Sequence, residues 1–305
     1  MPDTLVVSPF HAGEREVQTR VGVRERMDQR GIRALRAFMP DQHRSFFGLL
    51  TFLLVAIETT DGWPAATMLT GAPGFVASPD PTTLCITAHM PSLRRGAPIG
   101  ILGIDLSTRR RNRANGRIAA VFPGRFEVAV EQSFGNCDQY IQARGIVGQT
   151  TPAATRSESL AGIDAPARAA IEAADTFFVA SASEAGMDIS HRGGRPGFVR
   201  VDGDVLTIPD FAGNRYFNTL GNFVLNPRAA LLFPDFATGD VLHLTGNVEI
   251  VWDGEEVPRF DGAQRLWRVR VVAGERRRGA LALRWSRPEY APTTIATGTW
   301  RGSDR

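Results

Sequence analysis

The sequence has no lysine, only two cysteines and no long apolar run. All 35 basic residues are arginines, so any anion site must use guanidinium, backbone N–H or hydroxyl groups. Cys85 and Cys137 are too few for a disulfide framework or a thiolate metal cluster. The histidines are scattered, without an HExxH motif or a close pair. We therefore expect no metal site.

No segment approaches the roughly 18 apolar residues of a membrane span. The N-terminus lacks the apolar stretch of a signal peptide. We therefore expect a cytoplasmic protein without a membrane partner. At 305 residues, with 43% hydrophobic and 22% charged residues, the chain is globular and long enough for two domains. The net charge of +3 is only a weak hint of an anionic ligand, and we expect no nucleic acid partner.

The chain alternates short helical segments with many strand-like segments. Residues 1–40 are polar and arginine-rich, with helical spacing over 14–36, which predicts an N-terminal helical arm. A short helix over 42–50 with Asp41 as its cap is followed by a buried strand at 52–57 and a turn at Asp61-Gly62. Residues 150–165 have the composition of a linker, after which Asp164 and Pro166 open a helix.

Two series of residues recur in the same order along the chain. Pro73-Gly74-Phe75-Val76 matches Pro196-Gly197-Phe198-Val199 at an offset of 123, and Asp105 and Gly116 match Asp235 and Gly246 at an offset of 130. Each series lies in a similar sequence of strands, which indicates an internal duplication. We predict a mainly β fold (α+β) with peripheral helices and two tandem β-barrels that form an intramolecular pseudo-dimer. The predicted bounds are 1–40 for the arm, 41–150 for the first barrel and 164–290 for the second.

Two segments of the second copy combine arginine, glycine and small amides. They are Ser190–Val199 and Gly213–Asn222. Guanidinium forks, close backbone N–H groups and a helix N-terminus suit a phosphate. The first copy lacks these residues but has its own polar-aromatic segment, Glu131–Gln142, which we expect to begin a helix. If the barrels pack face to face, the two halves form one composite pocket and one degenerate counterpart. We interpret Arg109–Arg113 as a charged hairpin tip, with an anion contact as the alternative.

These segments resemble the pyridoxamine 5′-phosphate oxidase-like family of flavin-nucleotide-binding split β-barrels. The resemblance covers most of the chain from about residue 42 and is strongest in Ser190–Val199, Gly213–Asn222 and Asn226–Phe233. Asn136-Cys137-Asp138-Gln139-Tyr140-Ile141 is similar to a family helix that usually has proline where Asp138 stands. No match to the substrate-binding C-terminal segment of true pyridoxamine phosphate oxidases is present, so that substrate is not expected.

The resemblance implies FMN held between two barrels. Arg192 and Arg215 would hold the phosphate, Ser190, Asn214 and Asn218 would add hydrogen bonds, and Gly193 would serve the backbone geometry. His191 is either a structural or a functional histidine. From the first copy, Gln132, Ser133, Asn136 and Cys137 would face the flavin edge. No catalytic acid or base is identified.

The resulting hypotheses belong to different classes. The first is an FMN-dependent oxidoreductase whose second partner is NAD(P)H or another small electron donor or acceptor. The second is a non-catalytic flavin-binding carrier. The third is a haem-binding protein on the same barrel, with His191 or His243 as the ligand; a deazaflavin is a further alternative cofactor. The sequence leaves open whether the chain is an enzyme and whether it forms a homodimer.

Overall fold

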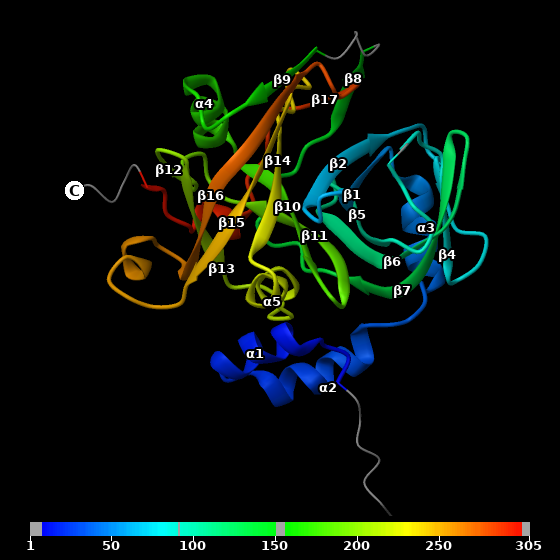
Figure 1. Cartoon of the computed structure of the whole chain (residues 1–305), viewed down its shortest axis with the longest axis horizontal. Helices are drawn as coiled ribbons and strands as arrows, with labels where there is room; N and C mark the ends of the chain where they lie inside the picture. Colours follow the sequence, from blue (N-terminus) through cyan, green and yellow to red (C-terminus); the bar gives the residue numbers. More distant parts are fainter. Residues whose placement is uncertain (1–7, 91, 151–155, 301–305) are drawn as a thin grey trace, which may run out of the picture.

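The computed structural model describes residues 8–90, 92–150 and 156–300, and two large antiparallel sheets dominate it (Figure 1). The first sheet has seven strands in the order β2-β1-β5-β6-β7-β4-β3. Its strands are β1 Phe52–Glu58, β2 Pro64–Thr70, β3 Val76–Ala77, β4 Thr83–Ile86, β5 Pro98–Asp105, β6 Arg110–Phe122 and β7 Arg125–Gly135.

The second sheet repeats this order as β11-β10-β14-β15-β16-β13-β12, with β9 paired to β16 beside it. Its strands are β9 Arg156–Leu160, β10 Thr176–Ser183, β11 Gly186–Gly193, β12 Arg200–Asp202, β13 Val205–Phe211, β14 Arg228–Pro234, β15 Val241–Val251 and β16 Ala263–Arg278. A separate pair joins β8 Ile146–Gln149 to β17 Leu283–Trp285. The predicted mainly β fold with peripheral helices is confirmed.

The recurring sequence motifs occupy equivalent places in the two sheets. Gly74 and Gly197 have φ angles of 90° and 89°, a region in which residues with a Cβ are strained. Phe75 N–H donates to Ala72 O at 2.9 Å, and Phe198 N–H donates to Arg195 O at the same distance. Gly116 and Gly246 both lie where the register of the strand pairing shifts. The same turn and the same bulge are therefore built twice from the same residue types.

The helices lie around the sheets. They are α1 Ala12–Arg20, α2 Arg24–Ala34, α3 Asp41–Leu49, α4 Ala165–Ala173, α5 Asn218–Leu225, η1 Val257–Arg259 and α6 Pro292–Ile295. The single helical stretch expected over 14–36 is broken at Gly22, whose φ of 68° ends α1. Asp41 lies inside α3, not at its cap, whereas Asp164 caps α4 by accepting from Ala167 N–H at 2.8 Å. The predicted linker lies partly outside the described residues, at 151–155, and its remainder includes β9.

The two sheets pack against each other through strands that are buried on both faces. Leu53 and Val55 of β1 enter the core of the first sheet, whereas Leu54 enters a cluster shared by both sheets. In β10, Phe177 enters the core of the second sheet, and Phe178 enters the shared cluster. Alternate residues point to opposite faces of a strand, so double burial requires the continuous apolar runs seen in the sequence.

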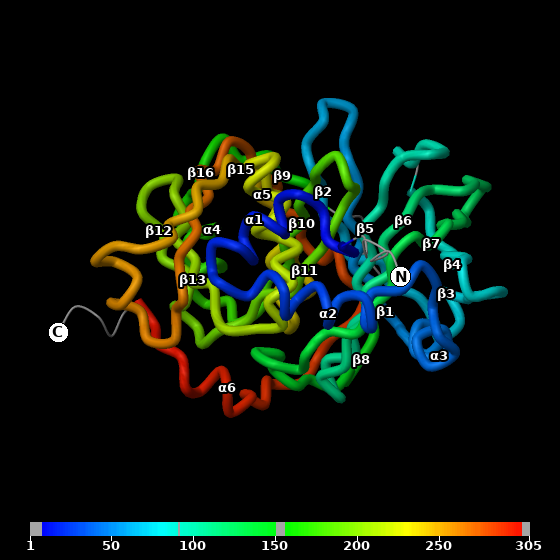
Figure 2. The backbone as a smooth tube through the Cα atoms, turned by 90° about the horizontal axis from the view of Figure 1, so that it is seen from below, coloured from blue at the N-terminus to red at the C-terminus, as the bar shows by residue number. Residues whose placement is uncertain are grey.

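Helices α1 and α2 cross the end of the second sheet beneath α5, with α1 against α5 and α2 outside it (Figures 1 and 2). Within the described residues, no helix has the length and apolarity to span a bilayer.

We expect Gly116→Ala to destabilise the protein. A Cβ at this bulge would lie 1.9 Å from the backbone oxygen of Ala129, which can move only with β7. The expected loss is about 1–3 kcal/mol of unfolding free energy, measured by chemical denaturation. Gly145→Ala is the matched control, because a Cβ there meets no atom within 4 Å. Equal stability of the two variants would contradict the packing at this bulge.

Candidate functional site

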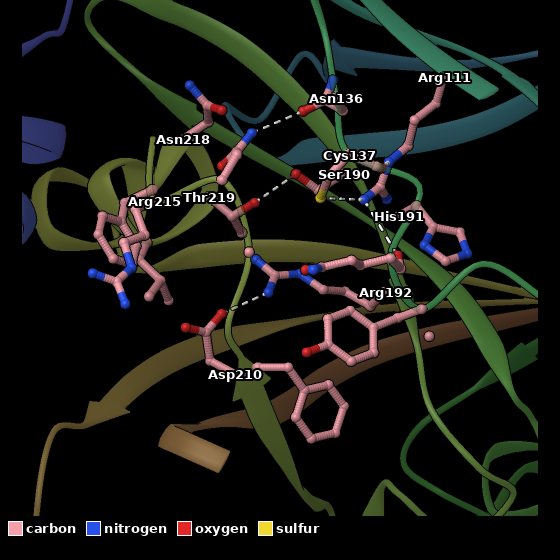
Figure 3. A pocket seen from close by; sticks show the side chains of 18 of the residues that line it. Arg111, Asn136, Cys137, Ser190, His191, Arg192, Asp210, Arg215, Asn218 and Thr219 are labelled. Atoms are coloured by element: carbon pink, nitrogen blue, oxygen red, sulfur yellow. Dashed lines mark hydrogen bonds and ion pairs between the residues drawn. The ribbon is translucent and has the colours of Figure 1, made fainter. Parts of the chain in front are cut away.

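A pocket between the two sheets brings together most of the predicted site residues (Figure 3). Its second-sheet wall comes from β11, the β13–α5 loop and α5, and its first-sheet wall from β6 and the segment after β7. The predicted residues that line it are Ser190, His191, Arg192, Gly193, Asn214, Arg215, Asn218, Asn136 and Cys137.

Strand β11 presents its side chains by simple alternation. Asp188, Ser190 and Arg192 share one face, and the Ser190 hydroxyl lies 3.1 Å from Asp188 Oδ2 and 2.7 Å from Thr219 Oγ1. His191 lies on the other face, opposite Phe178 in the ladder and edge-on to its ring. The serine is therefore held between its own strand and α5.

Arg192 is oriented by a carboxylate but retains free donors. Its Nη1 lies 2.7 Å from Asp210 Oδ1, and Asp210 also pairs with Arg265. The Arg192 Nε is buried without a hydrogen-bond partner, and the guanidinium lies 5.7 Å from the centre of the Trp267 ring. Asp210 carries a single negative charge, so it does not neutralise both Arg192 and Arg265.

The β13–α5 loop contributes Asn214 and Arg215 in a strained turn. Arg215 and Phe217 have φ angles of 63° and 62°, uncommon for residues other than glycine. Asn214 stabilises the turn by accepting from Tyr216 N–H at 3.0 Å, and its Nδ2 donates to Asn136 Oδ1 at 3.1 Å. In Figure 3, Arg215, Asn218 and Thr219 lie on one side of the pocket and Arg111 and Cys137 on the other.

Arginines on β6 supply the first-sheet wall. Arg113 is 5% exposed and crosses to the second sheet, where its Nε lies 2.7 Å from Asp188 Oδ1; it also hydrogen-bonds to Ser190 and to Asn136 Oδ1. Arg111 Nε donates to the Cys137 carbonyl at 2.8 Å. The predicted hairpin tip was therefore wrong for these two arginines. They lie within a strand, although Arg109 is in the turn with a φ of 55°.

The pocket is electropositive. Four arginines line it (Arg111, Arg113, Arg192 and Arg215) together with one acid, Asp210. Burial, followed by the charges of Arg111, Arg192 and Arg144, holds the pKa of His191 well below its usual range, so this imidazole is neutral near pH 7. The Nε2 of His191 is buried without a partner. An anion would be favoured here by the arginines and not by the histidine.

Gln132 and Ser133 do not line this pocket. Strand β7 continues to Gly135 and pairs these two residues with Asn115 and Ala114, so the helix expected over this segment does not begin here. Ser133 is fully buried, and its hydroxyl lies 2.9 Å from His43 Nδ1. Gln132 lines a separate cavity with Glu14 of α1.

The sequence analysis did not select three residues at the site: Arg113 and Tyr140, which line the pocket, and Asp188, which pairs with Arg113 beside it. The Asp188-x-Ser190-x-Arg192 alternation on a strand could have identified Asp188. The pairing of Arg113 with Asp188 carries no local signal, because 75 positions separate them. Tyr140, whose hydroxyl donates to Ala212 O at 3.1 Å and whose ring stacks on Phe211 at 5.0 Å, was noted only as part of a motif.

The equivalent positions of the first sheet carry no arginine or histidine. Thr67, Met68 and Leu69 pair with β1 as Ser190, His191 and Arg192 pair with β10. Met68 is packed in the inter-sheet cluster that also contains Trp285.

Residues 163–291 match the family described as Pyridoxamine 5′-phosphate oxidase. This segment contains β10–β16, α4 and α5, so the predicted resemblance is confirmed for the second sheet. A comparison with curated proteins finds no match.

Solved structures with some likeness include three bacterial proteins. HupZ of Group A Streptococcus is 16% identical, with 34% of this chain and 85% of that chain covered and a TM-score of 0.28. An FAD-binding protein of Mesorhizobium loti is 14% identical (41% and 99% covered, TM-score 0.30). The FAD-binding protein of Mycobacterium smegmatis is 13% identical (40% and 98% covered, TM-score 0.26). At these values the likenesses define neither a ligand nor an activity for this chain.

We expect Asp188→Ala to destabilise the protein strongly. The change leaves the Arg113 guanidinium buried without its carboxylate, which costs about 3–5 kcal/mol. The control is Glu131→Ala, which breaks the exposed pair of Glu131 with Arg117 and should cost at most about 1 kcal/mol. Chemical denaturation gives both values. A loss at Asp188 no larger than the control's would contradict the role of this pair.

The protein should lose stability as the pH falls from about 6.5 toward 4. Burial lowers the pKa of His243 to about 4 in the folded state, so the unfolded chain takes up its proton first. The contribution of His243 is therefore complete above its unfolded pKa and declines below it. Unfolding free energies at pH 7.5 and pH 5 should differ less in His243→Gln than in the wild type. An identical difference would show that His243 does not contribute.

Proposed function

We propose that the chain is an FMN-binding flavoprotein with one composite cofactor site, the pocket of Figure 3. The observation that carries this proposal is the excess of arginine over carboxylate in a pocket whose two walls come from the two sheets. The match of residues 163–291 to the pyridoxamine 5′-phosphate oxidase family supports it.

The donors present fit a phosphomonoester. Arg192 has an unpartnered buried Nε, and Arg215 carries no hydrogen bond or ion pair to any residue in the described part of the chain. Charge-assisted hydrogen bonds from guanidinium groups to phosphate oxygens are among the strongest in proteins. Arg192 and Arg215 would hold the phosphate, while Asn214, Asn218 and Ser190 would bind nearby oxygens. Asn136 and Cys137 would contact the ligand from the first sheet.

A bound flavin would supply electron transfer, and the protein would orient it and exclude water. Arg111 and Arg113 would keep the site positive and favour an anionic ligand. We propose a flavin-dependent oxidoreductase that uses NAD(P)H or another small-molecule donor. A flavin carrier without turnover is the alternative. The repeated strand order, together with the matched turn and bulge, supports a duplication, with barrels at 41–150 and 164–290 after the arm at 1–40.

One observation favours a second candidate, a haem-binding protein. His191 is neutral and its Nε2 has no partner, as an axial ligand requires. The visible spectrum of the purified protein separates the two candidates, because haem gives a Soret band and oxidised flavin does not.

Arg192→Ala should weaken FMN binding about 10- to 100-fold, because one charged hydrogen bond to the phosphate contributes about 1.5–3 kcal/mol. The same change should leave riboflavin binding unaltered, since riboflavin has no phosphate. Titration of flavin fluorescence measures both ligands. Arg94→Ala, in an exposed part of the first copy, is the control and should bind FMN as the wild type does.

Three outcomes would refute the proposal. If the wild-type protein binds no FMN, the proposed function is wrong. If Arg192→Ala lowers the affinities for FMN and for riboflavin equally, Arg192 does not bind the phosphate. Two FMN per chain would contradict the single composite site.

A further inference from the structure

The turn that carries Arg215 into the pocket is strained, although the Asn214 side chain accepts a hydrogen bond from Tyr216 N–H. Arg215 and Phe217 have left-handed backbone angles, and Phe217, the N-cap of α5, provides no side-chain hydrogen bond to the helix. A strained turn persists only where surrounding structure holds it.

That surrounding structure comes largely from the N-terminal helices. Gln18 of α1 is fully buried, and its Nε2 donates to the Tyr216 carbonyl at 3.2 Å. Glu14, 2% exposed, accepts a hydrogen bond from Asn218 Nδ2 through Oε1. The Tyr216 ring packs against Phe10 with their centres 5.4 Å apart. These contacts fall on Tyr216 of the turn and on Asn218, the first residue of α5.

The contact between α1 and α5 is very close. A Cβ on Gly13 would lie 2.0 Å from the Gly221 carbonyl oxygen, and one on Gly221 would lie 2.6 Å from Glu14 N. Glycine on both helices lets their backbones approach, so Glu14 and Gln18 reach the turn. A side chain at either glycine would separate the helices.

The carboxyl group of Glu14 is buried where α1 packs against α5. Its Oε2 accepts from His11 N–H at 2.9 Å, which closes a capping box at the start of α1. Burial raises the pKa of Glu14 to about 7; Asp188 acts in the same direction, while His11 N–H, Asn218 and Arg113 act against it. Burying this carboxyl group costs free energy, because its charged form loses contact with water. Its partner Asn218 lines the proposed phosphate site.

The segment that follows α2 is also fixed to the site. Arg36 and Ser133 exchange backbone hydrogen bonds of 3.1 and 2.7 Å next to the end of β7. The Ser133 hydroxyl contacts His43 of α3. Ser133 thus anchors the connection of the arm close to Asn136, on the opposite wall of the pocket.

We infer that the N-terminal arm, residues 8–36, is a positioning part of the cofactor site. Glu14 acts through Asn218 and Gln18 through Tyr216, and together they hold the turn that presents Arg215 to the phosphate. The inference rests on the proposed function for the identity of the ligand, FMN. The claim that the arm holds the turn does not depend on that function. Asn218 is the proposed phosphate contact to which the arm hydrogen-bonds.

The test compares Glu14→Ala, Glu14→Gln and the exposed control Glu16→Ala in the full-length protein. Glu14→Ala should weaken FMN binding at least 10-fold. Glu14→Gln keeps an acceptor for Asn218 and should restore most of the affinity, and Glu16→Ala should match the wild type. Gly13→Ala, which leaves all charges unchanged, should weaken FMN binding like Glu14→Ala by moving α1 away from α5.

Hydrogen exchange of the ligand-free variants reports on the turn without FMN. Glu14→Ala and Gly13→Ala should speed exchange over residues 213–222 while leaving β14 and β15 protected as in the wild type. Unchanged exchange there, or FMN affinity of Glu14→Ala equal to that of Glu16→Ala, would overturn the inference. If the wild-type protein binds no FMN, the proposed function fails, and the exchange experiment alone decides the role of the arm.

Discussion

The buried ion pair of Arg113 with Asp188 is the interaction on which the geometry of the pocket depends. It joins β6 of one sheet to β11 of the other, and the same guanidinium reaches Ser190 and Asn136. Two buried charges are costly to desolvate, so the pair contributes little net stability but strongly disfavours any arrangement that separates it. The sheets can also meet closely at this point because Gly100 of β5 has no Cβ; one would lie 2.9 Å from Asp188 Cα.

The apolar packing supports this polar contact without specifying it. Strands β1 and β10 are buried on both faces, and their inward residues form a cluster with Trp285 and Met68 between the sheets. Such packing is non-directional and tolerates small shifts. The ion pair and its hydrogen bonds are directional, so they fix the register of the two walls and with it the position of Arg192 relative to Arg111.

The two sheets have the same strand order, but the side chains at equivalent positions differ in polarity and charge. On β11 a serine and an arginine face the pocket, whereas the equivalent part of β2 carries Thr67 and Leu69. The position of Arg113 in the β-ladder corresponds to His243, whose pKa is lowered by burial. One interface between the sheets is polar and lined by arginines, whereas Met68 of the equivalent strand β2 belongs to the apolar cluster between the sheets.

The sequence alone determined many of the strands, their mainly β class and most of the second-sheet wall of the candidate site. These features follow from local patterns: apolar runs for doubly buried strands, Pro-Gly-Phe for a turn that requires a positive φ, and arginine beside glycine for an anion-binding loop. Only the tertiary structure decided that Arg111 and Arg113 reach the pocket, that Gln132 and Ser133 do not, and that Glu14 contacts Asn218. Those contacts join residues as far as 204 positions apart, and which residues meet depends on how the sheets and helices pack, which local sequence does not encode.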